Sequence, residues 1–226
     1  MTRTDIHIHS SFSDGLATPR QIVEFAVTRE FDRICITDHV RVDTAWLDEF
    51  FEEIEALKRE FAGRIEVLAG VEAKVLDMSG RIDADLGRVS RADLVLAAFH
   101  RIPRAKGFMA RRDIGRNKAE ALENWSMSMK AVLSNPAVQV IAHPGNIFKM
   151  NGVRIPTYLK EEIASLAGPS GKVFEHNLKY GVPDSGFLSL LVSEGVQILQ
   201  GSDAHSIAEL DELWSDWPAN ASSGQI

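Results

Sequence analysis

Short apolar runs alternate with helix-like stretches along the whole chain, and this alternation limits the fold more than any other feature of the sequence. The runs are rich in Val, Ile and Leu and have the length of buried strands. They cover residues 5–8, 34–37, 65–69, 94–99, 138–142, 173–175 and 196–199. Strands separated by helices form parallel sheets. Repeated βα units within 226 residues favour an α/β fold, a distorted (β/α)7 barrel, although periodicity alone leaves an open doubly wound sheet as the alternative.

The stretches between these runs carry helix signals. Thr18 and Gln21 have the spacing of a capping box at the start of a helix over 19–29. A helix starting at Asp43 has apolar residues every three or four positions, so its aromatic side chains are expected in the core. Further helices are expected over 116–133, 156–167, 185–194 and 207–213.

Composition limits the class of protein. We expect one domain over residues 1–215 and a C-terminal tail over 216–226. A net charge of -7 argues against a broad nucleic-acid-binding surface. The only cysteine, Cys35, lies in an apolar run, so neither a disulfide nor a thiolate zinc site is expected. Because no stretch has the apolar length of a signal peptide or a membrane span, we expect a cytoplasmic protein that does not contact membranes.

Ligand-type side chains gather where the predicted strands end. His7 and His9 lie two positions apart, on one face of an extended chain, which suits chelation of an ion. The later strands are followed by Asp38, His39, Glu72, His100, His143, Asp203 and His205. In a parallel barrel these positions converge on one rim. The alternative is that these are ordinary polar residues in loops. This is the usual role of any single histidine, but it explains poorly why six histidines follow predicted strands.

Imidazole and carboxylate ligands together suit Zn, Mn or Fe. Each ion takes about four donors, and a carboxylate can bridge two ions. So many ligand-type residues therefore predict two or three divalent transition-metal ions, with Glu72 and Asp203 as the bridging candidates.

A basic segment follows His100 directly. Residues 101–118 contain seven Lys and Arg and a single acid, Asp113, in an otherwise acidic chain. Guanidinium groups bind phosphate oxygens in bidentate fashion. The alternative is a solvated, mobile loop, but we expect the segment to overhang the metal site and bind substrate phosphate through Arg101, Arg104, Arg111, Arg112 and Arg116.

The sequence resembles the PHP family, named for its polymerase-associated and histidinol phosphatase members, and within it the compact stand-alone phosphatases. The motifs match in order: His7-Ile8-His9, Ser13-Asp14-Gly15, Thr37-Asp38-His39, Gly70-Val71-Glu72, Phe99-His100, His143-Pro144-Gly145-Asn146, Glu175-His176-Asn177 and Gly201-Ser202-Asp203-Ala204-His205. The resemblance implies a distorted seven-stranded barrel with a trinuclear site. One ion would be held by His7, His9, Glu72 and Asp203, a second by Glu72, His100 and His143, and a third by Asp14, His39 and His205.

Three further residues are expected to support these ligands. Glu175 and Asn177 share one face of a strand, whereas His176, between them, should point away and be structural. Asp38 is expected to orient a histidine rather than to bind metal itself.

The expected reaction is attack of a metal-bound hydroxide on a small phosphomonoester, either histidinol phosphate-like or nucleotide-like. The catalytic candidates are Glu72, Asp203 and His205, and the leaving alkoxide would take its proton from Asp203, His205 or water. Two alternatives remain, namely a phosphodiesterase or exonuclease acting on nucleic acid, and a catalytically silent metal-binding regulatory module. The intact set of ligands argues against the silent module.

Overall fold

The computed structural model describes residues 2–216 and contains one seven-stranded sheet in which all neighbouring strands are parallel. The strand order follows the sequence: β1 (Thr4–Ile8), β2 (Arg33–Val40), β3 (Glu66–Lys74), β4 (Leu94–Ala98), β5 (Val140–Ile141), β6 (Val173–Asn177) and β7 (Ile198–Gly201). The expected seven-stranded barrel in a single domain is therefore confirmed. Apart from Asp216, the expected tail lies outside the described residues.

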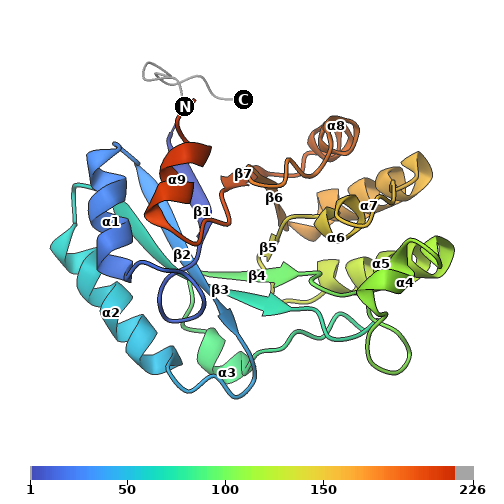
Figure 1. Cartoon of the computed structure of the whole chain (residues 1–226), viewed down its shortest axis with the longest axis horizontal. Coiled ribbons are helices and arrows are strands. Elements are labelled where there is room, and N and C mark those ends of the chain that lie inside the picture. Colours follow the sequence, from blue (N-terminus) through green and yellow to red (C-terminus); the bar gives the residue numbers. More distant parts are fainter. Residues whose placement is uncertain (1, 217–226) are drawn as a thin grey trace.

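Helices surround the strands, with α1 and α2 on one side and α5, α7 and α8 on the other (Figure 1). The described helices are α1 (Pro19–Thr28), α2 (Leu47–Glu60), α3 (Leu86–Val89), α4 (Arg111–Ile114), α5 (Lys118–Leu133), α6 (Asn146–Lys149), α7 (Thr157–Ser170), α8 (Ser185–Ser193) and α9 (Ile207–Leu213). Of the helices in the described part of the chain, none is long and apolar enough to cross a membrane.

Two helix starts show how local chemistry sets the boundaries. The capping box at α1 is present, since Thr18 N donates to Gln21 Oε1 at 2.9 Å and Gln21 N to Thr18 Oγ1 at 3.3 Å. The expected start at Asp43 is wrong, and α2 begins at Leu47. A turn precedes it, in which Thr44 N donates to Arg41 O and Arg41 N donates to Thr44 Oγ1.

The first and last strands close the barrel at their carboxyl ends. Ile8 and Ala204 form a parallel bridge, His9 N donates to Ala204 O at 2.9 Å, and Asp203 N donates to His7 O at 2.8 Å. The buried Asp5 carboxylate adds a second connection, because it accepts from Ser202 N at 3.0 Å and from Trp214 Nε1 at 2.7 Å. Contacts from the segment after β7 thus close the ring.

The apolar core has two parts. The larger one lies between the helices and the sheet and includes the fully buried rings of Trp125, Phe50 and Phe148. The smaller one takes residues only from the strands and their immediate continuations, among them Cys35 and Leu96, so it fills the side of the sheet away from the helices. Close packing on both faces fixes the strand ends that carry the polar residues described next.

Candidate metal centre

The strands bring the predicted ligand residues to one rim of the barrel. The β2–β3 register places His39 directly beside Glu72, because these two residues are paired across the strands. His7 lies in β1, and His9 and Asp14 follow that strand. His100 follows β4 by two residues, and the remaining ligand-type residues follow β5 and β7. All nine side chains predicted as metal ligands lie in this group.

Glu72 is at the centre of the group and is only 1% exposed. Its Oε1 lies 2.9 Å from His143 Nε2 and 3.2 Å from His100 Nε2. Its Oε2 lies 2.6 Å from His39 Nδ1. One carboxylate thus faces imidazoles from three other strand ends, which is the arrangement a bridging ligand needs.

His7, His9 and Asp203 form one side of the group. The Nε2 atoms of the two histidines are 3.1 Å apart, and His9 Nε2 lies 3.0 Å from Asp203 Oδ1. Tetrahedral ligands with bonds near 2.0–2.1 Å lie roughly 3.3 Å from one another. These atoms therefore have the spacing of ligands around one small cation.

Asp14 lies on the opposite, more open side, and its side chain is 53% exposed. Its Oδ2 is 3.5 Å from His39 Nε2, and its Oδ1 is 3.4 Å from His205 Nε2 and 3.8 Å from His9 Nδ1. These four residues satisfy the spacing of a metal site. His9 thus joins this group as well as that of His7.

Asp38 supports the Asp14 loop, whereas we predicted that it would orient a histidine. Its Oδ1 accepts from Ser10 N at 2.9 Å and from Ser13 Oγ at 2.5 Å, and its Oδ2 accepts from Ser10 Oγ at 2.6 Å. The prediction missed these contacts because the 10–15 loop folds back over β2. Asp38 therefore acts by fixing the segment that carries Asp14.

Glu175 and Asn177 lie behind His7. Glu175 Oε1 accepts from His7 Nδ1 at 3.0 Å and from Asn177 Nδ2 at 2.8 Å, while its Oε2 accepts from the backbone of His143. The bond to Nδ1 turns His7 Nε2 towards Glu72. His176 is half-buried between these two buried neighbours, as expected of a side chain on the other face of β6.

The chemistry of the buried atoms fits bound cations. His9 Nδ1 is buried and has no hydrogen-bond partner among the described residues. Buried polar atoms normally have such partners. Burial acts to raise the pKa of Glu72, but the charges of His100 and His7 outweigh it and hold the pKa well below its usual range. An ionised carboxylate among imidazoles is a donor set for a metal such as Zn, Mn or Fe.

Backbone strain coincides with two of these residues. His143 and Asp203 have φ values of 29° and 55°, in the left-handed region that side chains other than glycine rarely adopt. Such conformations cost about 1–3 kcal/mol each and concentrate at functional sites. The packing at the ends of β5 and β7 therefore holds these two side chains in place.

Tyr180 is a site residue that the sequence analysis missed. Its ring lies edge-on to that of His143, with 6.1 Å between the ring centroids. Burial, together with the charge of Asp203 and a hydrogen bond to it, raises the pKa of the Tyr180 hydroxyl. The feature of the sequence that could have identified Tyr180 is its position just after the Glu175-His176-Asn177 motif, in a loop at the same rim.

The five arginines predicted to bind phosphate divide into three sets. Arg101 and Arg111 line a hollow of about 490 Å³ beside His100. Arg104 forms an ion pair with Glu120, with 2.8 Å between Nε and Oε1, and its guanidinium is therefore engaged. Arg112 and Arg116 are exposed and do not line the hollow.

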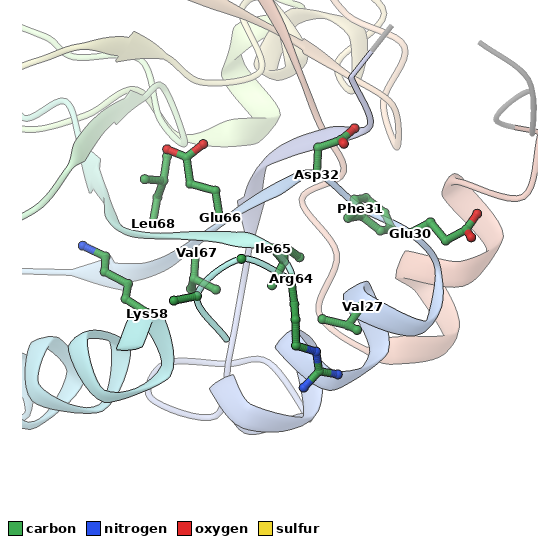
Figure 2. A pocket seen from close by; sticks show the side chains of 12 residues that line it. Val27, Glu30, Phe31, Asp32, Lys58, Arg64, Ile65, Glu66, Val67 and Leu68 are labelled. Atoms are coloured by element: carbon green, nitrogen blue, oxygen red, sulfur yellow. The ribbon is translucent and has the colours of Figure 1, made fainter. Parts of the chain in front are cut away.

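A second hollow, of about 850 Å³, lies at the amino ends of β2 and β3 (Figure 2). Lys58, Arg64 and Glu66 are among its lining residues. Two of its charged groups have protein partners of opposite charge, as Lys58 Nζ lies 2.7 Å from Asp93 Oδ2 and Glu66 Oε2 lies 2.6 Å from Arg33 Nε. The hollow is at the opposite end of the strands from the histidine cluster.

Comparison with known proteins agrees with this site. The family model described as "PHP domain" matches residues 5–179. A protein of Thermoanaerobacter named a probable phosphatase is 28% identical over 211 residues, 89% of this chain and 78% of that protein. DNA polymerase/3'-5' exonuclease PolX of Bacillus subtilis is 26% identical over 220 residues, which are 92% of this chain but only 35% of the polymerase. The chain thus spans about a third of that relative.

A solved structure shares the fold. Histidinol phosphate phosphatase from Lactococcus lactis, complexed with Zn, L-histidinol and phosphate, superposes with a TM-score of 0.67 at 20% identity, covering 95% of this chain and 93% of that one. Together with the sequence matches, the fold and the histidine and carboxylate cluster define a metal-dependent phosphoesterase. The chain belongs to the PHP domain family.

Proposed function

We propose that this chain is a phosphatase that releases phosphate from a small phosphomonoester and that it holds two or three divalent ions. The observation that carries the proposal is the crowding of eight ligand-type side chains around Glu72, together with the buried and unpaired Nδ1 atom of His9. Zn, Mn and Fe suit this mixture of imidazole and carboxylate. The zinc and phosphate in the Lactococcus lactis structure support the same assignment.

We assign the ligands as three groups that share residues. His7, His9, Glu72 and Asp203 would hold one ion, Glu72, His100 and His143 a second, and Asp14, His39 and His205 a third. The contacts of Glu72 support its shared role. The 3.8 Å separation of His9 Nδ1 from Asp14 Oδ1 supports adding His9 to the third group.

Bound ions of this kind supply a nucleophile at neutral pH and polarise phosphoryl oxygens. The protein's own residues position the reaction. Glu72 holds the ligand groups together, and Glu175 fixes the ring of His7. Asp203 and His205 are the candidates for protonating the leaving oxygen, because both lie on the rim and His205 Nδ1 is oriented by Asp203 O at 2.9 Å.

The test is phosphate release by protein purified without chelator. We expect at least one transition metal per chain, release of phosphate from a generic monoester, loss of that activity with chelator and its return with Mn, Zn or Fe. Faster hydrolysis of bis(4-nitrophenyl) phosphate than of the monoester would favour the phosphodiesterase alternative. Less than one metal per chain, or activity insensitive to chelator, would overturn the proposal.

A further inference from the structure

The hollow beside His100 combines an apolar floor with two arginines. Its volume of about 490 Å³ suits the organic part of a small ligand. Met109, Ile114 and Ile147 form the floor and are at most 4% exposed. The hollow adjoins the metal centre, since His100 lines it and also lies 3.2 Å from Glu72.

The guanidinium groups at this hollow are available to a ligand. Arg101 lies 5.9 Å from the centroid of the Phe108 ring, and Arg111 donates to the thioether of Met150 at 3.8 Å, a weak acceptor. Within the described part of the chain, neither forms an ion pair. Arg104, only three residues from Arg101, pairs with Glu120 instead. The basic segment therefore leaves unpaired the two arginines that face the hollow.

Arg101 and Arg111 give the lining of the hollow a positive charge. No acidic residue is among the described residues that line it. An ammonium group bound there would meet two guanidinium groups without a carboxylate, and like charges brought together in a pocket repel one another. A carboxylate or a second phosphate would instead gain charge-assisted hydrogen bonds.

We propose that the organic part of the substrate has an apolar body and carries a negative charge of its own, bound by Arg101 and Arg111. This inference rests on the proposed phosphatase function and narrows its substrate class. It favours a nucleotide-like compound with a second anionic group over a histidinol phosphate-like compound, whose amine is cationic. The scissile phosphate lies at the metal centre, and the second anion lies at the arginines.

The test compares three aryl phosphates that share a ring and a scissile ester. They are phenyl phosphate, 4-carboxyphenyl phosphate and 4-(aminomethyl)phenyl phosphate, assayed with the metal-loaded protein at constant ionic strength. We expect kcat/KM for the carboxylate to exceed that for the ammonium compound by at least about tenfold, the factor that one hydrogen bond between charged groups supplies. Equal values, or a preference for the ammonium compound, would overturn the inference.

Variants of single residues test which side chains cause the preference for the carboxylate compound. Arg101→Gln and Arg111→Gln should each reduce it, mainly by raising KM for the carboxylate compound. Lys106→Gln removes the same charge from the same segment at an exposed position that does not line the hollow, so it should preserve the preference. If Lys106→Gln reduces it equally, the arginines are not its source. Should a variant fail to fold, the wild-type series still decides, and if none of the three esters is hydrolysed, the proposed phosphatase function itself fails.

Discussion

The two ends of the barrel both carry charged side chains beside a hollow, but they differ in how those charges are paired. At the amino ends, Lys58 and Glu66 contact oppositely charged partners in pairs that are open to solvent. At the carboxyl ends, Glu72 is buried and faces several imidazoles, and the buried Nδ1 atom of His9 has no hydrogen-bond partner among the described residues. Exposed pairs contribute little, whereas buried and crowded ionisable groups mark sites of binding and catalysis. Charge pairing, and not the size of the hollow, separates the two ends.

The largest effect should come from exchanging the central carboxylate. Glu72→Gln removes the charge that two of the three proposed ligand groups share and that His39 of the third group contacts, and metal-ion stabilisation of a reaction is worth several kcal/mol. We expect phosphate release to fall by roughly a thousandfold and the metal content to fall with it. Elemental analysis and a phosphate assay measure both. The matched change at the other end, Glu66→Gln, should leave both unchanged, and a comparable loss there would remove the contrast between the two ends.

A smaller effect on metal binding is expected from Glu175, which lies behind the predicted metal ligands. Glu175→Gln keeps the shape of the side chain but removes the negative charge that orients His7. Substituting such supporting residues typically costs 10–100-fold in metal affinity or activity. Competition with a chromogenic chelator measures the affinity. His176→Gln, in the same strand but on its other face, is the control, and an equal loss from that variant would show that β6 as a whole is sensitive.

Loss of a contact that closes the barrel should reduce the stability of the protein more than its activity. Trp214→Phe removes the Nε1 donor that contacts Asp5 Oδ2 at 2.7 Å, leaving a buried acceptor with one partner fewer. Such losses cost about 1–3 kcal/mol. At roughly 2–4 °C per kcal/mol for a protein of this size, the melting temperature should fall measurably. Activity per folded molecule should persist, and its loss at full stability would contradict this separation.

The smallest effect is expected for an exposed pair at the amino ends. Arg33 and Glu66 contact each other at 2.6 Å, but their side chains are 42% and 52% exposed. Arg33→Gln should therefore change the free energy of unfolding by less than about 1 kcal/mol and leave phosphate release unaltered. Chemical denaturation measures the first quantity. A change well above that value would mean that this end depends on its charges more than the geometry indicates.

The sequence predicted the positions of the strands because each contains a short apolar run, and their parallel order follows from the helices between them. It missed α3, α4 and α6, since four residues are too few to show a helical period. It also placed the start of α2 four residues early, because the turn at Thr44 depends on a side-chain bond to Arg41.

The convergence of His7, Glu72 and His143 was predictable because the carboxyl ends of parallel strands meet at one rim. The partners of Asp38, Asp5 and Tyr180 were not, since those contacts join segments far apart in the sequence and no periodic pattern encodes them. The same holds for Arg104, whose pairing with Glu120 needs the fold of the segment between them.

Closure of the barrel through Asp5 and Trp214 also sets an order of assembly. These two residues are 209 positions apart, and the segment between them includes every residue assigned to the metal centre. While the chain is being synthesised, His7 and His9 leave the ribosome long before Asp203 does. Until the last strand pairs with the first, the early histidines can only form an incomplete cage. Stable loading with ions should therefore follow the emergence of Asp203 and His205 from the ribosome.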